Sequence, residues 1–436
     1  MTNVLNTLEE RASTQPDAVA VDDGERTVTY QELWTLTDRF AGGLRRRGIA
    51  DGDAVAVHAP PGVDGLIACY GALRNGSVVV PVPDDLLPDA VSICRDCDVS
   101  AVVSVADRLS AFVTARFQQS IAVRIAIGGN PPLSISMADA LDGDDLSSAI
   151  GRDTGSGIMS FGASRHDSSP TVVARRDDDT ALIACVSRAG ELVATPVSHG
   201  AIRASVEAFD ALVPRGLAAT DVHLGALPLT TVSGVILTTS ATLYTGGTYA
   251  PLPRWDPDRI QEIGASRGLT ITALEPDQLA DLLDAVGSRT TSSPRSLRTI
   301  AVVGPTPDEG RCDRLRAWSG VDAIQVAGYA ETGPVAFGTR SSDALIAGSL
   351  GTPIEPMRVR VVDETLAPVP AVPRWAIRDP PDDAVGRVLV TGPTLSTGPS
   401  GSSTATGSRV VELDGDRWFE IDDPGYRSED GDVFTV

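Results

Sequence analysis

The sequence contains no lysine, which excludes any chemistry or ion pairing that depends on a lysine ammonium group. All 36 basic residues are arginine, against 58 acidic residues, so the 436-residue chain carries a formal net charge of −22 at neutral pH. Nucleic acids and anionic membranes are also negatively charged and would be repelled by such a chain. The composition therefore argues against either as a partner.

The excess of acidic residues has two interpretations. An acidic surface without lysine is typical of proteins from a cytoplasm kept at high salt, where salt screens the repulsion between carboxylates. A genome rich in G and C also favours arginine over lysine, but it does not explain an isoelectric point near 4.5. We therefore expect a halophilic protein and keep codon bias as the alternative.

Long apolar runs and cysteines are also scarce. No stretch reaches the roughly 18 apolar residues of a membrane-spanning helix, and the acidic N-terminus MTNVLNTLEERASTQPD has no apolar signal core. The odd set of five cysteines fits a reduced cytoplasm, where we expect the protein to reside. Cys94 and Cys97 have metal or redox spacing, but no second pair or nearby histidine completes a site. We expect this pair to end a helix before the strand VSAVVSV.

Patterns typical of helices and strands alternate through most of the chain. TYQELWTLTDRFAGGLRRRGI has apolar residues at helical spacing, and Thr29 with Glu32 has the pattern of a capping box. Short β-branched runs such as DAVAVHAP, SVVVPV, LTITALE and LRTIAVVG predict buried strands. Such alternation predicts parallel βαβ units and hence an α/β fold.

Breaks in this pattern divide the chain into four segments. Residues 1–152 and 171–345 should form two adjoining αβ layered subdomains with largely parallel sheets, separated by a polar linker at residues 153–170. Residues 346–436 contain short strands without helices, which predicts a small C-terminal β-barrel-like subdomain. Within it, residues 392–408 are of low complexity.

The order of motifs resembles the adenylate-forming enzymes, which include AMP-forming acyl-CoA synthetases and the adenylation domains of peptide synthetases. The resemblance covers nearly the whole chain and rests on TVTYQEL, LRRRGIADGDAVAV, GALRNGSVVVPV, LPLTTVSG, LRTIAVVGPT, AGYAETG, GSLGTPI, VGRVLVTGP and DRWFEIDDPGYRSEDGDVF. In that family a large N-terminal domain of two αβ layers and a β-barrel holds ATP and an acid. A small C-terminal domain then rotates to complete each half-reaction.

The family's phosphate-binding loop, roughly YTSGTTGxPKG, corresponds here to residues 184–194, ACVSRAGELVA. Such a loop surrounds phosphate with backbone N–H groups, and hydroxyl groups and a lysine add donors. Ser187 and Gly190 keep this character, whereas Val193 stands at the lysine position and Glu191 adds negative charge. Arg188 would supply the lost cation, because guanidinium groups bind phosphate well. The alternative is an arginine in a solvated loop.

Two further motifs each retain an acidic residue. The family's YGxTE motif appears as AGYAE, so Gly328 and Glu331 remain, and the resemblance assigns Mg²⁺ to the glutamate, a hard oxygen ligand. The family's TGD motif, whose aspartate holds the ribose hydroxyls, appears as IDD and assigns the ribose to Asp423. The alternatives are a helix-start acid for Glu331 and a surface acid for Asp423. Ala327 replaces the family's tyrosine beside the adenine.

Other positions depart from the family's pattern. Thr231 stands where the family has an aromatic residue or histidine at the acyl pocket, and Arg387 reverses the charge of the family's Gly-Glu pair. The chain ends at Val436, so we expect the family's mobile C-terminal domain to be absent. That domain carries a lysine that bridges the acid and the α-phosphate, and it helps to form the pantetheine tunnel. We therefore expect no CoA binding by this chain alone and assign no catalytic residue.

Three functions remain open. The first is a degenerate family member that binds a nucleotide or acyl-adenylate weakly, with Mg²⁺ and ATP or AMP as the implied ligands, and shows little or no turnover. The second is an active AMP-forming acid–CoA ligase completed by a C-terminal domain from a separate chain. The third is a non-catalytic interaction protein. The expected partners are accordingly a small-molecule acid or adenylate, or a partner protein, with no nucleic acid and no membrane span.

Overall fold

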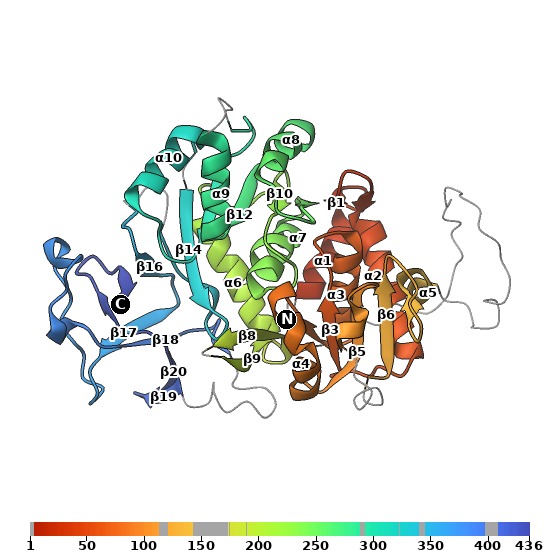
Figure 1. Cartoon of the computed structure of the whole chain (residues 1–436), viewed down its shortest axis with the longest axis horizontal. Helices are drawn as coiled ribbons and strands as arrows, with labels where there is room; N and C mark the ends of the chain where they lie inside the picture. Colours follow the sequence, from red (N-terminus) through yellow and green to blue (C-terminus); the bar gives the residue numbers. More distant parts are fainter. Residues whose placement is uncertain are drawn as a thin grey trace.

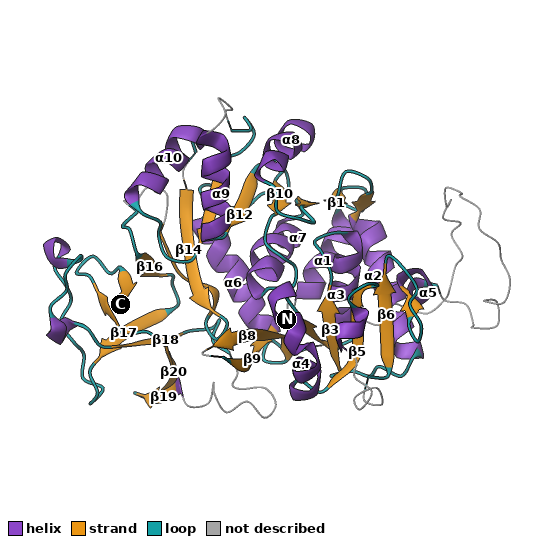
Figure 2. Ribbon diagram, viewed as in Figure 1, coloured by secondary structure: helices purple, strands orange, loops and turns teal. Residues whose placement is uncertain are grey.

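The computed structural model describes residues 4–112, 121–142, 173, 175–188, 190–287, 293–321, 323–339, 345–396 and 409–436. Its strands form sheets of seven, eleven and four strands. Helices pack around the two larger sheets, and the four-stranded sheet lies at the opposite end of the molecule from the N-terminal αβ region (Figure 1, Figure 2). The predicted α/β fold is confirmed, whereas the predicted linker at 153–170 lies outside the described residues.

The seven-stranded sheet is ordered β7-β6-β5-β3-β4-β8-β9. All its strand pairs are parallel except the hairpin of β8 and β9 at one edge. Its strands are β3 (Ala54–His58), β4 (Val78–Pro81), β5 (Val99–Val105), β6 (Val123–Ile127), β7 (Ile135–Ser136), β8 (Thr180–Arg188) and β9 (Glu191–Ser198). Its region of the chain also contains α2 (Tyr30–Arg46), α3 (Val63–Arg74), α4 (Ala90–Asp96) and α5 (Met137–Leu141).

The eleven-stranded sheet is ordered β2-β1-β11-β10-β12-β13-β14-β15-β16-β22-β21. The run from β1 to β14 is parallel, and antiparallel strands flank it. Its strands are β1 (Val19–Asp22), β2 (Thr27–Thr29), β10 (Val222–Gly225), β11 (Thr248–Pro251), β12 (Ile271–Leu274), β13 (Thr299–Val303), β14 (Ala323–Tyr329), β15 (Gly333–Thr339), β16 (Ser349–Pro353), β21 (Gly425–Arg427) and β22 (Val433–Thr435). The accompanying helices are α1 (Val4–Thr14), α6 (His199–Leu212), α7 (Ala241–Thr245), α8 (Pro257–Arg267), α9 (Pro276–Gly287) and α10 (Glu309–Ser319).

The two larger sheets exchange strands. The N-terminal strands β1 and β2 belong to the eleven-stranded sheet, where β1 lies parallel to β11. Conversely, β8 and β9 come after residue 171 but complete the seven-stranded sheet through β4. The predicted boundary between two αβ subdomains therefore does not coincide with the division between sheets, because each sheet draws strands from both segments.

The C-terminal region contains a separate antiparallel sheet ordered β17-β18-β20-β19, which confirms the predicted change to short strands. Its strands are β17 (Arg358–Val362), β18 (Arg387–Thr391), β19 (Val410–Leu413) and β20 (Asp416–Glu420). Trp418 of β20 is fully buried and donates from its indole nitrogen to the Leu413 carbonyl at 3.2 Å. From the same region, β16, β21 and β22 extend the eleven-stranded sheet rather than this one.

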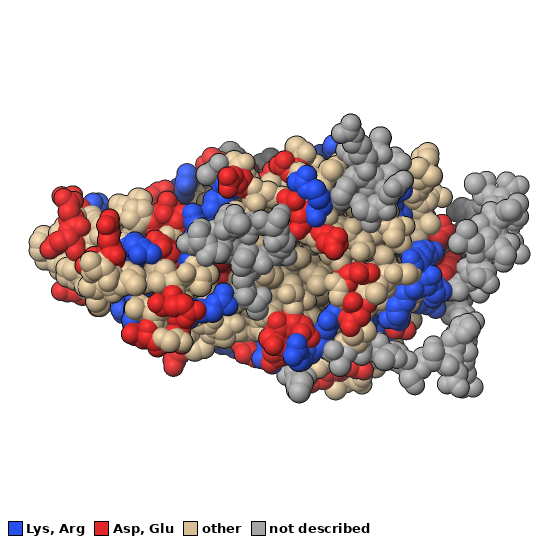
Figure 3. All heavy atoms as spheres, turned by 90° about the horizontal axis from the view of Figure 1, so that it is seen from below, with Lys and Arg blue, Asp and Glu red and all other residues tan. Residues whose placement is uncertain are grey.

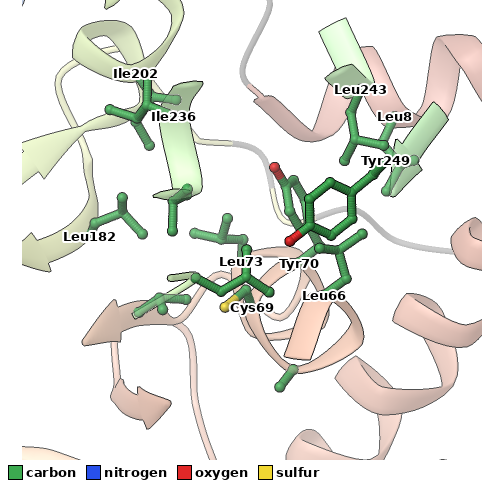
Figure 4. Packing of buried hydrophobic residues seen from close by; sticks show 14 of the residues in the cluster. Leu8, Leu66, Cys69, Tyr70, Leu73, Leu182, Ile202, Ile236, Leu243 and Tyr249 are labelled. Carbon is green, nitrogen blue, oxygen red and sulfur yellow. The ribbon is translucent and has the colours of Figure 1, made fainter. Parts of the chain in front are cut away.

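One buried cluster joins the two larger sheets. It includes Tyr70 of α3, Tyr249 of β11 and Leu182 of β8 (Figure 4). The Tyr70 hydroxyl lies 3.0 Å from the Ser240 Oγ in a π-helical segment, Gly234–Ser240, and the Tyr30 hydroxyl donates to the Gly247 carbonyl at 2.7 Å. Apolar burial of this extent is the main favourable contribution to folding, so we expect the two sheets to unfold together.

Two local features agree with the sequence. Thr29 and Glu32 form the predicted capping box at the start of α2. Cys97 caps the C-terminus of α4, directly before β5, and both Cys94 and Cys97 are free thiols in the core. None of the helices in the described part of the chain has both the length and the apolar content needed to cross a lipid bilayer.

Candidate functional site

A cavity of about 620 Å³ lies where strands of both larger sheets reach their carboxyl ends. Open α/β sheets place ligands at this edge. From the seven-stranded sheet the lining includes Pro81 and residues 184–187, and from the eleven-stranded sheet it includes Glu275 and residues 328–330. The segment 230–233, which precedes the π-helical turn, forms a further wall. The cavity is the first candidate for a ligand site.

The residues predicted to bind phosphate form a β-hairpin. The ladder of β8 and β9 continues to the pair Arg188–Glu191, so only two residues join the strands. Gly190 adopts the positive φ of +81° that such a turn favours. Successive N–H groups of an extended strand point to opposite sides, whereas a phosphate cradle needs them to converge. Ser187 lines the cavity near the end of β8, and Gly190 is exposed at the tip.

The side chain of Arg188, the last residue of β8, contacts two carboxylates. Its guanidinium donates to both oxygens of Glu331, with N···O distances of 2.7 and 3.2 Å, and its Nε lies 2.6 Å from an oxygen of Asp422. Arg409 also forms an ion pair with Asp422. The Glu331 carboxylate is almost fully buried and the Arg188 side chain is 21% exposed. We call these four residues the Arg188 cluster.

The loop that carries Glu331 is tightly built. Gly328, the penultimate residue of β14, lies so close to the next strand that a Cβ there would lie 1.8 Å from the Gly333 carbonyl oxygen. The Thr332 hydroxyl accepts from the Tyr329 backbone N–H at 2.9 Å, and Ser396 donates its N–H to the Glu331 carbonyl at 2.7 Å. Gly328 lines the cavity, and in this structure its lack of a side chain permits the close approach of β15.

Asp423 is exposed, one residue beyond the Arg188 cluster. It lies near Tyr329, whose pKa is raised to about 12 by burial, with a further contribution from the Asp423 charge. Tyr329 lines the cavity and Asp423 does not. The structure therefore brings Arg188 and Glu331 into contact and places Asp423 beside them, outside the cavity wall.

Sequence reasoning missed Asp422 and Arg409. Asp422 and Asp423 are adjacent acids, and the motif comparison pointed only to the second. Arg409 follows a stretch of low complexity and belongs to no motif, so no signal in the sequence marks it as a site residue. The charge reversal at Arg387 does have a local explanation, because its guanidinium donates to Glu420 on the neighbouring strand at 2.7 Å.

One end of the cavity is acidic. Asp84 and Asp85 follow β4, and Glu275 stands between β12 and α9. Burial raises the pKa of Glu275, and the charges of Asp277 and Asp85 raise it further. His58 contacts Asp84, with 2.7 Å between the His58 Nε2 and the Asp84 Oδ1. Thr231, at the predicted acyl-pocket position, lines the cavity and donates its hydroxyl to the Pro228 carbonyl at 3.0 Å.

An Mg²⁺ site does not fit this arrangement. Glu331 is the implied ligand, but both of its oxygens already accept hydrogen bonds from Arg188. No group of three or more potential metal-binding side chains occurs among the residues that the structure describes. Ribose contact by Asp423 does fit, because its exposed carboxylate has acceptor oxygens for two hydroxyl groups.

Several solved structures match the fold over essentially the whole chain, and two serve as examples. The N-terminal domain of FACL13 from Mycobacterium tuberculosis has a TM-score of 0.81 at 20% identity, with 100% of this chain and 99% of that chain covered. The O-succinylbenzoate coenzyme A synthetase of Bacillus subtilis, in complex with ATP and magnesium, has a TM-score of 0.77 at 17% identity, with 99% and 79% covered.

Sequence comparison finds similarity to a CoA ligase and to a pyochelin synthase. The chain is 26% identical to the indoleacetate–CoA ligase of Aromatoleum aromaticum over 432 residues, which are 97% of this chain and 76% of the ligase. It is 27% identical to the pyochelin synthase PchD of Pseudomonas aeruginosa over 83% of this chain and 63% of that protein. The profile of the AMP-binding enzymes matches residues 8–398. The chain belongs to the AMP-binding enzyme family.

Proposed function

We propose that this family member holds an adenylate and does not by itself activate an acid with ATP. The ion pair between Arg188 and Glu331 is the observation that carries the proposal. It places a fixed guanidinium on the carboxylate that the family resemblance assigns to Mg²⁺. With that carboxylate occupied, no group of metal-binding side chains in the described part of the chain remains to hold a metal–triphosphate complex.

The hairpin of β8 and β9 supports the same conclusion. The extended backbone of its described residues offers no convergent set of N–H groups, and the nearby Arg188 already binds two carboxylates. The sequence has no lysine to replace the bridging lysine of the family. Loss of one preorganised donor to a developing charge typically costs about 10²–10³ in rate, so loss of several should leave little turnover.

We expect pyrophosphate exchange by the isolated chain to remain at background with ATP, Mg²⁺ and a broad panel of acids. Val193→Lys should not restore it, because Val193 is buried in β9 and the other phosphate contacts are still missing. An active ligase of the family, assayed in parallel, serves as the positive control. Exchange clearly above the blank by the unmodified chain would favour the active-ligase alternative and make Arg188 the first residue to mutate.

We expect AMP to bind more tightly than ATP, in the high-micromolar to millimolar range. The ribose contact at Asp423 does not depend on phosphate charge, whereas a triphosphate meets Glu191 and a strongly negative chain. Calorimetric titration should show that Asp423→Ala abolishes AMP binding. Asp416→Ala, a matched loss of an acid that pairs with Arg358 in the four-stranded sheet, should leave it intact. Tighter binding of ATP, or unchanged affinity in Asp423→Ala, would refute the adenylate proposal.

Two alternatives are distinguished by the same measurements. A ligase completed in trans should gain pyrophosphate exchange when a separate C-terminal domain is added. A pure interaction protein should bind neither AMP nor ATP. The exposed Asp423 carboxylate favours the adenylate proposal over the second of these.

We also propose that the protein is adapted to high salt. Acidic side chains are spread over the face shown in Figure 3, in groups separated by neutral surface and by arginines. Their mutual repulsion should weaken as salt shortens the Debye length to about 3 Å at 1 M. The melting temperature should therefore rise between about 0.1 and about 2 M KCl. A flat or falling melting temperature would leave codon bias as the explanation for the missing lysine.

A further inference from the structure

Two cysteines from distant parts of the chain meet beside the cavity. The Cys97 Sγ, at the C-terminal end of α4, lies 3.9 Å from the Cys185 Sγ of β8, although 88 positions separate the two residues. Both thiols are free, and each residue is 6% exposed. They belong to an apolar cluster that α4 shares with β8 and that also includes Ile93 and Ile183. The proposed function uses neither thiol.

The geometry of this contact suits a disulfide bond. A disulfide joins its sulfur atoms at about 2.05 Å, so the two Sγ atoms must approach each other by about 1.9 Å. Rotation of the side chains about their Cα–Cβ bonds moves a sulfur atom over such a distance. No group of three or more potential metal ligands occurs in the ranges that the structure describes, so the pair is better suited to a disulfide than to a metal site.

The cavity gives a small oxidant access to one of the two thiols. Cys185 lines the cavity, between Ala184 and Val186, whereas Cys97 does not. An oxidant in the cavity therefore meets Cys185 first, and Cys97 lies close enough to react with the adduct. A reactive thiol with a second thiol beside it is the arrangement by which proteins form reversible disulfides.

We propose that Cys97 and Cys185 form a reversible disulfide when a low-molecular-weight disulfide enters the cavity, so that the pair is a redox modification site in the cavity wall. In a reducing compartment such a bond forms only transiently, as in redox-sensing proteins. The proposal does not depend on adenylate binding, because it requires only the two thiols and the cavity.

The reaction is a thiol–disulfide exchange in two steps. The Cys185 thiol loses its proton to water, and its sulfur attacks the small disulfide, breaks the S–S bond and releases one small thiolate. The Cys97 thiol then loses its proton, and its sulfur attacks the Cys185 Sγ and releases the second small thiolate. The two thiolates take up the two protons. The protein thus loses two electrons and two protons, and one small disulfide becomes two small thiols.

The environment of Cys185 makes the first step slow at neutral pH. The contact with Cys97, together with burial, raises the pKa of the Cys185 thiol. Because the thiolate is the attacking species, its small fraction limits the rate. The exchange should therefore be followed at about pH 8.5, where the thiolate fraction is larger.

The disulfide would act on the candidate site through β8. Ser187 and Arg188 follow Cys185 by two and three residues on this strand. A covalent bond from Cys185 to the end of α4 would hold this part of β8 against the helix. The oxidation state of the pair would thereby reach the cavity wall and the start of the Arg188 cluster.

Peptide mapping after oxidation tests the pairing in the full folded chain. Cys312→Ser serves as the background, because Cys312 is only partly buried and would link separate molecules. The protein is incubated with oxidised mercaptoethanol, alkylated and digested with trypsin, which cleaves after Arg95 and so separates Cys94 from Cys97. We expect a linked pair of peptides, 96–108 with 177–188, that dithiothreitol releases. A link that involves Cys94, or one that forms only in urea, would overturn the proposal.

Three variants assign the steps to individual thiols. Cys97→Ala should abolish the link and leave Cys185 as a mixed disulfide with mercaptoethanol. Cys185→Ala should also abolish the link and leave Cys97 unmodified. Cys94→Ala is the matched control, since it removes a buried thiol from the same helix, and it should leave the yield of the link unchanged. If Cys97 forms the mixed disulfide in Cys185→Ala, or if Cys94→Ala abolishes the link, the assignment is wrong. If one of the two pair variants does not fold, the other still tests the link.

Discussion

Arg188→Ala should lower the free energy of unfolding by about 3–5 kcal/mol, the cost of leaving a buried charge without its partner. The Glu331 carboxylate is almost fully buried, and Arg188 supplies hydrogen bonds to both of its oxygens. Without the guanidinium, this carboxylate must stay buried and unpaired or become protonated. Urea unfolding at neutral pH, followed by fluorescence, measures the loss.

Two variants make the Arg188 result specific. Arg387→Ala breaks a similar Arg–Glu contact, but its side chains are 34% and 25% exposed, so the loss should be about 1 kcal/mol or less. The double variant Arg188→Ala/Glu331→Ala should recover much of the lost stability, because it removes the unpaired charge. If Arg188→Ala lowers the free energy of unfolding no more than Arg387→Ala does, the ion pair between Arg188 and Glu331 does not stabilise the fold as we infer.

Stability should fall steeply between pH 6.5 and about 4, by about 3 kcal/mol for each of two buried histidines. Burial lowers the pKa of His199 to about 4, with Arg175 contributing. Burial also lowers the pKa of His223 to about 4, and Arg298 lowers it further while Asp221 opposes the shift. His199 Nδ1 and His223 Nε2 have no hydrogen-bond partner in the described structure.

The sign follows from proton uptake. The unfolded chain binds protons at these histidines as the pH falls below about 6.5, while the folded chain remains neutral there until about pH 4. Acid therefore favours the unfolded state between about pH 6.5 and about pH 4. Above about pH 6.5 these histidines no longer lower the free energy of unfolding. Chemical unfolding at successive pH values should show the slope, and His199→Gln with His223→Gln should flatten it. Leu283→Ala, a buried apolar control in α9, should lower the whole curve and keep the slope.

Local signals in the sequence identified the elements, but pairing between distant segments did not follow from them. The capping box at Thr29 and the helix end at Cys97 depend on neighbouring residues, and the structure confirms both. The exchange of β1 and β8 between the sheets depends on contacts between residues far apart in sequence. Strand patterns predict burial and alternation, and they do not say which sheet a strand joins.

The candidate site likewise combines features that local sequence signals predict with contacts that they do not. A two-residue turn with glycine between two apolar runs is a hairpin signal, so the turn at Gly190 could have been recognised before any comparison with a phosphate loop. The contact from Arg188 to Asp422 joins residues more than two hundred positions apart, and no periodicity encodes it. Glu331 and Arg188 were each identified from a motif, whereas the contact between them was not, because an arginine fork can reach many carboxylates on a chain with 58 acids.

The strand exchange between the two larger sheets has a mechanical consequence. If each sheet were built from one continuous segment of the chain, rotation about a single hinge could open the cleft between the sheets. Here β1 and β2 of the N-terminal segment belong to the eleven-stranded sheet, and β8 and β9 of the later segment belong to the seven-stranded sheet. These two strand exchanges, together with the buried core that both sheets share, hold the walls of the cleft in place. Ligands must therefore enter and leave through movements of side chains and turns at the rim, while the walls keep their spacing.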